Sequence, residues 1–232
     1  MLRLVIANKL YSSWSLRPWL VMRAFEIPFE EKAVPLRRPE TKDAIAKYSP
    51  SGKLPALIDG DVVIWESLAI IEYLAENKAD KQIWPRNREA RAHARAISNE
   101  MHGGFLALRQ ACPMNLAKRF MTPALSDDAV TNVARIEQIW RDARARFGTR
   151  THGAGPYLFG QFTAADAMYA PLVTRLDTYQ IPVAAGTRAY MDAILSHPSF
   201  MQWKKEALTE PWTIDEYETG HTATETFRET FR

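Results

Sequence analysis

Cysteine is nearly absent from the 232-residue sequence, which contains only Cys112. A single cysteine excludes an internal disulfide framework, a zinc site built on cysteine ligands and a Cys-x-x-Cys redox pair. The five histidines show no metal-ligand spacing, so no metal cofactor is expected. Because disulfides are rare in reducing compartments, this cysteine usage favours a cytoplasmic protein.

The sequence also lacks a long hydrophobic run and an excess of charge of one sign. Its apolar start, residues 2–7, contains Arg3 and is shorter than a signal-peptide core or a membrane span. The 30 Lys+Arg and 27 Asp+Glu leave a net charge of +3, without the clustered basic face that nucleic-acid binding requires. We therefore expect a globular protein with no secretion signal, no membrane span and no nucleic-acid partner.

The local patterns change near the end of the first third of the chain, which indicates two domains. Residues 1–78 predict the order βαβαββα. The strands are expected at 2–7, 30–35, 56–58 and 62–65, and the helices at 16–25, 41–47 and 67–77. A right-handed crossover makes the first two strands parallel, whereas Asp59-Gly60 predicts an antiparallel hairpin for the last two. Residues 79–87, charged and containing Pro85, are interpreted as a linker.

Residues 88–208 predict an all-helical second domain. Apolar residues recur at helical spacing over 97–108, in a long helix that Pro113 must interrupt or end, and again over 133–147. Shorter helices are expected at 164–177, 188–195 and 200–208. The acidic C-terminal tail, residues 209–232, is interpreted as mobile or docked on a partner.

The turn at residues 11–18 carries the first chemical signal, because Pro18 limits where the following helix begins. Proline is tolerated where a helix N–H has no intrahelical partner, which predicts a helix cap at Ser15 or later. Ser12 and Ser13 then precede unpaired N–H groups, which attract an anion or a thiolate. Without a histidine and acid in triad order, these hydroxyls are expected to donate to a sulfur, not to act as nucleophiles. Alternatively, both serines only satisfy the backbone of the turn.

A second group of residues, 51–57 and 65–67, fits the same ligand. A proline directly before a strand can hold a cis peptide, so the Leu54-Pro55 bond is expected to turn the Leu54 backbone outward to pair with an extended peptide. Ser67, at a helix start, offers an anion site for a carboxylate. The alternative role for Ser67 is a plain N-cap.

Together these residues resemble the cytosolic glutathione transferase family, and within it the serine-type zeta and theta classes. The resemblance rests on the order of a Ser-Ser-x-Ser-x-Arg turn, a Leu-Pro pair, a Glu66-Ser67 pair and a capping box from Thr163 to Asp166. It implies an α/β, thioredoxin-like N-terminal domain that binds glutathione, followed by an all-α C-terminal helical bundle.

The resemblance also implies roles for individual residues at glutathione. Ser12 corresponds to the motif serine that hydrogen-bonds the sulfur, and Ser13 and Tyr11 are the alternatives that stay open. Trp14 is also placed at glutathione; it replaces the cysteine usual in the zeta motif, so the chemistry tied to that cysteine should be absent. The other implied contacts are the backbone of Leu54, beside Pro55, with the cysteinyl part, Glu66 and Ser67 with the γ-glutamyl end, and Lys53 or Arg38 with the glycine carboxylate.

In the family, the electrophile pocket lies between the two domains. Its expected lining residues here are Tyr11, Met101, Phe105, Arg109, Cys112 and Met114. For all of these except Tyr11, a role in the core or at a dimer interface is the alternative. Arg175 lies about one helical turn from the position of the zeta class's substrate-binding arginine, so that role is not transferred to it.

The implied function is that of a homodimeric enzyme of detoxification. It would activate the thiol of glutathione, its cosubstrate, and conjugate it to small hydrophobic electrophiles. The first alternative is a glutathione-dependent cis-trans isomerase of the maleylacetoacetate isomerase kind, which consumes no glutathione. The second is a non-catalytic binding module, since a fold alone does not establish activity. The sequence does not identify the electrophile.

Overall fold

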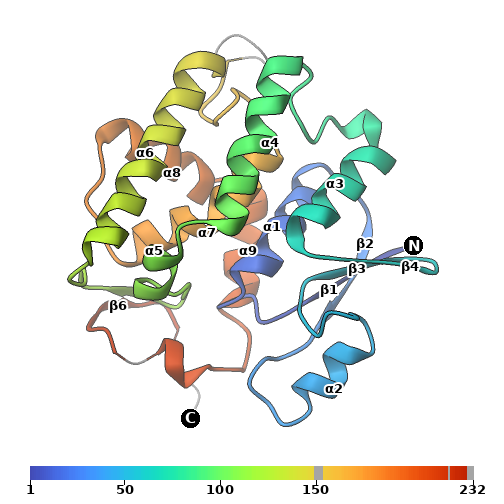
Figure 1. Ribbon diagram of the computed structural model, residues 1–232. Helices are drawn as coiled ribbons and strands as arrows, with labels where there is room; N and C mark the ends of the chain where they lie inside the picture. The colour runs from blue at the N-terminus through green and yellow to red at the C-terminus, as the bar shows by residue number, and fades with distance from the viewer. Residues whose placement is uncertain (149–153, 219, 229–232) are drawn as a thin grey trace.

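The structure is a computed structural model that describes residues 1–148, 154–218 and 220–228. Residues 149–153, 219 and 229–232, of which 219 and 229–232 belong to the predicted tail, lie outside the described residues. Figure 1 shows a small sheet flanked by helices and, beside it, a larger group of helices. Within the described ranges, every helix is too short or too polar to span a lipid bilayer.

The main sheet has four strands in the order β2-β1-β3-β4. These are β1 (Leu2–Ile6), β2 (Phe29–Ala33), β3 (Ala56–Asp59) and β4 (Val62–Trp65). β1 pairs in parallel with β2, and β3 pairs antiparallel with β1 and β4, so the predicted parallel pair and the predicted hairpin are confirmed. Gly60, in the hairpin turn, has a φ of 58°, which glycine adopts at no steric cost.

Helices cover both faces of this sheet. They are α1 (Ser13–Ala24), α2 (Thr41–Ala46) and α3 (Ser67–Asn77). Successive side chains of a strand point to opposite faces, so Leu4 and Ile6 join the main core together with α1 and α3. Val5 faces the other way and packs with Ile45 of α2 and with Val34. The predicted order βαβαββα is therefore confirmed.

Helix α1 begins earlier than predicted. Its N-cap is Ser12, not Ser15 or a later residue, and Pro18 lies inside the helix. An interior proline costs about 3 kcal/mol. Burial of Leu16 and Trp19, which are fully buried, stabilises the helix by roughly 1.5–3 kcal/mol for each side chain. The prediction was wrong because it weighed the lost hydrogen bond without this burial.

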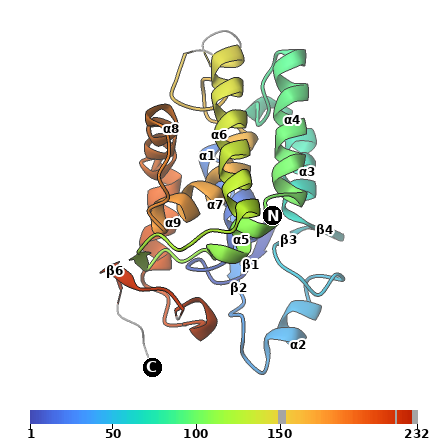
Figure 2. The ribbon, with the colours of Figure 1, turned by 60° about the vertical axis from the view of Figure 1, so that its left-hand side comes forward.

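The second part of the chain contains longer helices. They are α4 (Arg88–Gly103), α5 (Leu106–Ala111), α6 (Asp127–Phe147), α7 (Ala164–Thr178), α8 (Ala185–Leu195) and α9 (Pro198–Ala207). Helix α7 is buried along almost its whole length and packs against α1 and α4. Figure 2 shows α4 and α6 standing side by side at the outside of this group. Through α7, the helical part reaches the start of α1.

The single helix predicted over 97–108 is instead two helices, α4 and α5. The helix is interrupted at Gly104 and Phe105, and Phe105 has a φ of 60°. A Cβ at Gly104 would lie 2.6 Å from the carbonyl oxygen of Glu100, so only glycine fits there. Pro113 is not this interruption, but α5 ends at Ala111, just before Pro113, which agrees with the alternative that Pro113 ends the helix.

The predicted linker, residues 79–87, is packed against the core. It contains a short 3-10 helix, Ala79–Lys81. Ile83 and Trp84 are buried in the main core, which includes side chains from both parts of the chain. This segment therefore does not separate the two parts but contributes to the core that they share.

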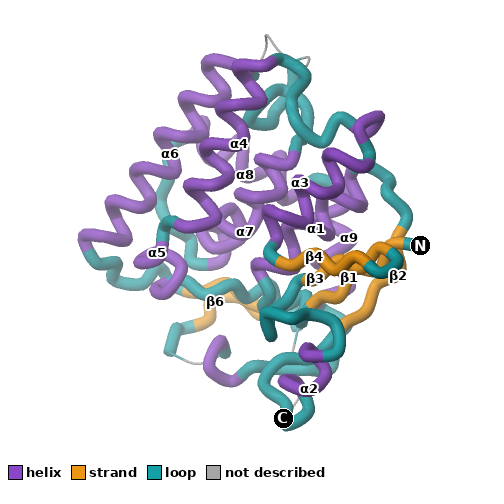
Figure 3. Tube along the Cα trace, turned by 45° about the vertical axis from the view of Figure 1, so that its right-hand side comes forward, coloured by secondary structure: helices purple, strands orange, loops and turns teal. Residues whose placement is uncertain are grey.

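The described part of the tail makes contacts with the rest of the chain, which the expectation of a mobile or partner-docked tail did not include. Strand β6 (Ala223–Thr226) pairs antiparallel with β5 (Lys118–Phe120), so the second part is not entirely helical. Figure 3 shows these strands in orange below the helices. A 3-10 helix, Asp215–Tyr217, precedes β6, and Glu218 pairs with Lys118 at 2.7 Å. An acidic side chain of the described tail thus pairs with a basic side chain of the same chain.

Candidate functional site

A cleft of about 700 Å³ lies where the start of α1 meets the helical part. Its walls come from the turn before α1, the loop before β3, helix α5 with the residues after it, Arg175 of α7, and the tail around Tyr217. Five segments far apart in the sequence therefore meet at the amino end of one helix. Unpaired N–H groups at such a helix end favour negative charge.

Ser12 lies in this cleft as the cap of α1. Its Oγ accepts a hydrogen bond from the Ser15 N–H at 3.3 Å, and its hydroxyl donates to Ser15 Oγ at 2.9 Å. Ser15 Oγ also accepts from the Ala7 N–H at 3.0 Å, which ties the end of β1 to the helix. The Ser12 hydroxyl is therefore committed to the turn, and Ser15 has a structural role that differs from the predicted one of helix cap.

Ser13, the next residue, meets the helical part of the chain. Nη2 of Arg175 donates to Ser13 Oγ at 3.2 Å, and Nη1 of the same side chain donates to the carbonyl of Cys112 at 2.7 Å. Ser13 and Arg175 are both buried and both line the cleft. A cationic donor on a hydroxyl oxygen polarises the O–H and strengthens it as a donor.

Tyr11 donates its hydroxyl to the carboxylate of Glu218, and its ring packs 5.7 Å from that of Tyr217. Burial raises the pKa of Tyr11, and the hydrogen bond to Glu218 raises it further. The amide of Asn115 donates to the same carboxylate oxygen at 3.1 Å. Tyr11 is therefore protonated at neutral pH, and its proton is directed toward the tail.

Trp14 lies against two guanidinium groups. The distance from its ring centroid to Cζ is 4.1 Å for Arg17 and 4.7 Å for Arg109. The His102 ring meets Trp14 edge to face at 5.1 Å. Cation–π contacts of this kind contribute about 0.5–2 kcal/mol each, depending on how dry the site is. Trp14 thus orders two cations beside the cleft.

Arg17 connects this turn to the second predicted group of residues. Its Nη1 donates to Ser67 Oγ at 3.4 Å, and both residues are fully buried. Glu66 is the N-cap of α3, with a φ of 70°, which is uncommon for a residue other than glycine. Ser67 is the first helical residue and makes no capping hydrogen bond. The alternative that Ser67 is the N-cap is therefore wrong.

Arg17, Arg109 and Arg175 form a cationic cluster, and none of the three makes a salt bridge with the described residues. Burial lowers the pKa of all three guanidinium groups. The pKa of Arg175 falls to about 10, and the charge of Arg109 contributes to that shift. The buried Nε atoms of Arg17 and Arg175 have no hydrogen-bond partner among the described residues. Because unpaired buried charge is costly, this cluster favours an anionic ligand.

Several predicted site residues line the cleft together. They are Tyr11, Ser12, Ser13, Trp14, Lys53, Leu54, Arg109 and Met114. The Leu54-Pro55 bond is cis, as predicted. Pro55 follows the lining residues Lys53 and Leu54 without lining the cleft itself. Within the described ranges, no group of three or more His, Cys, Asp and Glu side chains is placed to hold a metal ion.

Other predicted residues lie outside the lining of the cleft. Met101, Phe105 and Cys112 are buried in the main hydrophobic core, because their apolar side chains face the neighbouring helices; the alternative of a core role fits them. Burial raises the pKa of the Cys112 thiol to about 11. Glu66 and Ser67 are connected to the cleft through Arg17, and Arg38 lies on the exposed turn before α2.

Several residues that line the cleft were not predicted from the sequence, among them Arg175, Glu216, Tyr217 and His221. The last three belong to the tail, which no local pattern places over the site. One sequence signal was available for Glu216, because it lies in an acidic segment that is expected to pair with basic residues. In the structure, Glu216 pairs with Arg37 at 3.0 Å.

Models of both domains of a known family match the chain. The N-terminal domain of glutathione S-transferase matches residues 11–77, and its C-terminal domain matches residues 118–203. Together the two ranges cover more than half of the chain and include the start of α1, the Leu54-Pro55 bond and Arg175.

Curated relatives match over about half of the chain. A protein from Caenorhabditis elegans named "Probable maleylacetoacetate isomerase" is 36% identical over 107 residues, which are 46% of this chain and 49% of that protein. Glutathione S-transferase theta-1 from Mus musculus is 33% identical over 106 residues, which are 45% of this chain and 43% of that protein. The matches thus span less than half the length of each of these relatives.

Solved structures share the fold along nearly the whole chain. A glutathione transferase homologue from Burkholderia gl BGR1, with bound glutathione, is 22% identical, has a TM-score of 0.65 and covers 89% of this chain and 97% of its own. A maleyl pyruvate isomerase, described as a bacterial zeta-class glutathione S-transferase, is 23% identical, has a TM-score of 0.68 and covers 90% and 99%. With both domain models matched and the fold shared, the chain belongs to the glutathione S-transferase family.

Proposed function

We propose that this protein binds glutathione, ionises its thiol and transfers the glutathionyl group, through its sulfur, to a small electrophile. One observation carries the proposal: serine hydroxyls at the amino end of α1 share a cleft with Arg109 and Arg175, whose cationic cluster has no salt-bridge partner among the described residues. Helix end, hydroxyl and guanidinium groups all stabilise the same species, a thiolate.

The proposed binding mode assigns each end of the tripeptide to a wall of the cleft. The backbone of Leu54, at the cis peptide, pairs with the cysteinyl part. Arg17, held by Ser67 beside Glu66, receives the γ-glutamyl carboxylate. Lys53, which lines the cleft, is better placed for the glycine carboxylate than the exposed Arg38. In this mode the sulfur faces the start of α1.

The proposed reaction is a nucleophilic transfer. The thiol proton leaves to solvent, the thiolate forms a bond to the electrophilic carbon, and the leaving group departs with its bonding electron pair. Lowering the thiol pKa by two units requires about 2.7 kcal/mol of preferential stabilisation. One hydrogen bond to a charged group contributes about 1.5–3 kcal/mol, and a helix end up to about 1 kcal/mol more. The groups at the cleft are therefore sufficient to lower the thiol pKa by two units. Holding the thiolate next to the electrophile then lowers the barrier of the transfer itself.

A glutathione-dependent isomerase is the second candidate. The observation that favours it is Arg109, half-buried against Trp14 in the cleft, where its guanidinium suits a substrate that carries a carboxylate. The relative named "Probable maleylacetoacetate isomerase" points the same way. In isomerisation, glutathione adds to the substrate and is released again, so its concentration does not fall.

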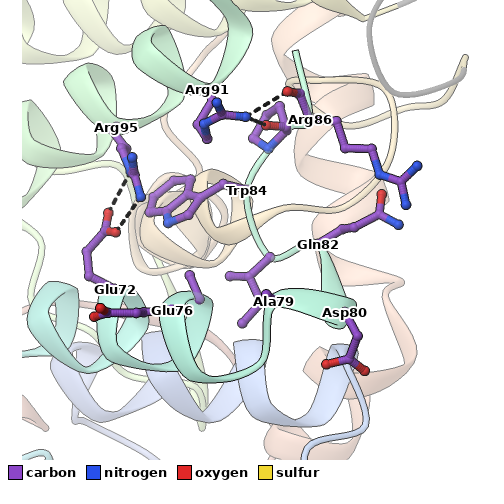
Figure 4. Close-up of a pocket in the computed structure, with 12 residues that line it drawn as sticks. Glu72, Glu76, Ala79, Asp80, Gln82, Trp84, Arg86, Arg91 and Arg95 are labelled. Carbon is purple, nitrogen blue, oxygen red and sulfur yellow. Dashed lines mark hydrogen bonds and ion pairs between the residues drawn. The ribbon is translucent and has the colours of Figure 1, made fainter. Parts of the chain in front are cut away.

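We further propose a homodimer through the face formed by α3, α4 and β4. A second cleft, of about 540 Å³, lies between α3 and α4. Figure 4 shows acidic side chains along one side of it and arginines along the other. The acidic residues are Glu72, Glu76 and Asp80, and the arginines are Arg86, Arg91 and Arg95. A two-fold axis places the acidic row of one protomer opposite the basic row of its partner.

The edge strand β4 adds an apolar contact to this proposed interface, because Val62, Val63 and Trp65 are exposed. The double variant Val63→Asp and Trp65→Lys should convert a dimer into a 26.4 kDa monomer in light scattering. A wild type that is already monomeric at micromolar concentration would contradict the proposed dimer.

A reducing, cytoplasmic location and a role in detoxification are part of the proposal. The buried, protonated Cys112 suits a reducing compartment. Activity toward several unrelated electrophiles would support detoxification, whereas activity toward a single metabolite would contradict it.

The test of the proposed function is capture on immobilised glutathione, followed by conjugation of an aryl halide with the free thiol measured over time. We expect capture and a stoichiometric loss of thiol. Turnover of a cis-unsaturated acid without loss of thiol would establish the isomerase instead, and capture without turnover of either substrate would indicate a binding module. Failure of capture would exclude both enzymatic functions.

A further inference from the structure

The side chains of Tyr11, Ser12, Ser13 and Tyr217 bring four hydroxyls to the lining of the cleft. Of the three at the start of α1, those of Tyr11, Ser12 and Ser13, only one is uncommitted. The Ser12 hydroxyl donates to Ser15 Oγ, and the Tyr11 hydroxyl donates to Glu218. Among the hydrogen bonds of the described residues, the Ser13 hydroxyl accepts one from Arg175 and donates none. Its proton is therefore the one free to point at a ligand.

Arg175 is held so that it serves this hydroxyl. It comes from the buried helix α7, and its Nη1 is anchored on the carbonyl of Cys112 at 2.7 Å, which orients Nη2 toward Ser13. A donor on Ser13 Oγ occupies a lone pair of that oxygen and turns the O–H away from the guanidinium. The hydrogen bond thus sets both the direction and the strength of the Ser13 donor.

The charges around Arg175 reinforce this effect. Arg109 of α5 is its cationic neighbour, and Arg17 of α1 belongs to the same cluster. Cys112, Tyr179 and Tyr217 also face it. Burial raises the pKa of Cys112 and of Tyr179, so both are neutral. The nearby carboxylate of Glu218 is engaged by Lys118, Asn115 and Tyr11.

We propose that Ser13, not Ser12, donates the hydrogen bond to the glutathione thiolate, and that Arg175 is the positioning residue that aims and polarises Ser13 from the other domain. This inference rests on the proposed function and names the residue pair that performs its first step. It differs from what the family resemblance implies, in which the first serine of the motif, Ser12, holds the sulfur.

The experiment measures the thiol pKa of bound glutathione from thiolate absorbance against pH, as a difference spectrum against each protein without glutathione. The variants are Ser13→Ala, Ser12→Ala, Tyr11→Phe, Arg175→Met and Arg175→Lys. We expect Ser13→Ala and Arg175→Met each to raise the bound thiol pKa by roughly one unit or more, which is a tenfold loss of thiolate below that pKa. Arg175→Lys should recover part of the shift, because lysine keeps the charge and a donor.

The control variants should separate positioning from a merely structural role. Ser12→Ala removes a helix cap and should lower the unfolding midpoint, with little change in the thiol pKa. Tyr11→Phe should leave the thiol pKa unchanged. The double variant Ser13→Ala with Arg175→Met should raise the pKa no more than the larger single change, because the two residues act through one hydrogen bond.

Two results would overturn the inference while the proposed function stands. One is a larger thiol pKa shift in Ser12→Ala than in Ser13→Ala. The other is an unchanged thiol pKa in both Arg175 variants while they still bind glutathione. If Arg175→Met does not fold, Arg175→Lys and Ser13→Ala decide the matter. Absence of glutathione binding by the wild type would overturn the inference and the proposed function together.

Discussion

Two buried polar clusters of this protein differ in whether they are complete. At the start of α7, the fully buried carboxylate of Asp166 accepts four hydrogen bonds. The donors are the Thr163 N–H at 2.8 Å, the Thr163 hydroxyl at 2.9 Å, the Leu158 N–H at 3.1 Å and the Tyr190 hydroxyl at 3.2 Å. Each of these donors meets the carboxylate within the chain, so the cluster needs no ligand.

The cluster at the start of α1 is incomplete, because its buried cations have donors that lack acceptors among the described residues. Arg17 and Arg175 are buried cations whose described hydrogen-bond acceptors are neutral oxygens: Ser67 Oγ for Arg17, and Ser13 Oγ and the Cys112 carbonyl for Arg175. Each retains a buried Nε without a described partner. Hydrogen-bond completeness therefore separates a structural cluster from a binding site, since an incomplete cluster leaves a cost that a ligand removes.

Breaking the complete cluster should have the largest effect. Asp166→Ala leaves several buried donors without an acceptor, and we expect the free energy of unfolding to fall by about 3–5 kcal/mol in urea titrations. The matched change in the other cluster, Arg175→Met, should cost less than about 1 kcal/mol because it removes a buried like charge. A smaller loss for Asp166→Ala than for Arg175→Met would contradict the comparison.

The pH dependence of stability should give a second test of the difference between the two clusters. Burial raises the pKa of Asp166 from 3.8 to about 6, against the opposing hydrogen bonds. The folded state therefore binds this proton more tightly than the unfolded chain does. The contribution of Asp166 to stability is largest below pH 4 and is lost as pH rises through 6, by up to about 3 kcal/mol.

We expect the wild type to lose stability relative to Asp166→Asn between pH 4 and pH 7, measured as the difference between the two unfolding free energies. Taking the difference removes the titration of other groups. A difference that grows in favour of the wild type with rising pH would mean that the four hydrogen bonds outweigh burial.

Removing a cation from the incomplete cluster should affect binding more than folding. Arg17→Met should weaken glutathione binding by roughly tenfold to a hundredfold, the equivalent of one hydrogen bond to a charged group. Calorimetric titration measures this. Arg135→Met is the control, because Arg135 pairs with Glu100 on the exposed surface, away from the cleft. Equal affinities for the two variants would remove Arg17 from the proposed site.

An ordinary helix cap gives the smallest effect. Ser126 caps α6 by accepting from the Ala129 N–H at 3.3 Å. Ser126→Ala should lower the free energy of unfolding by about 1 kcal/mol and leave glutathione affinity unchanged. A loss as large as that of Asp166→Ala would show that capping alone, without the other donors, explains the first cluster.

Local chemistry allowed much of the fold to be predicted. The Asp59-Gly60 turn specifies its hairpin, and the spacing from Thr163 to Asp166 specifies a capping box, because each motif is satisfied within a few residues. The start of α1 was misplaced because the burial that tolerates Pro18 comes from distant residues. The break at Gly104 was missed because its cause is the close approach of the Glu100 carbonyl.

By itself, the sequence determined the order of strands and helices, the two-part architecture, the family and the group of residues at the start of the first helix. These follow from short-range periodicity and from motifs whose members lie near one another. Only the tertiary structure decided which of the hydroxyls at the start of α1 has no acceptor. It also decided that Arg175 donates to Ser13 and that the acidic tail lines the cleft beside Tyr11. Those contacts join residues more than 150 positions apart, and only packing brings them together.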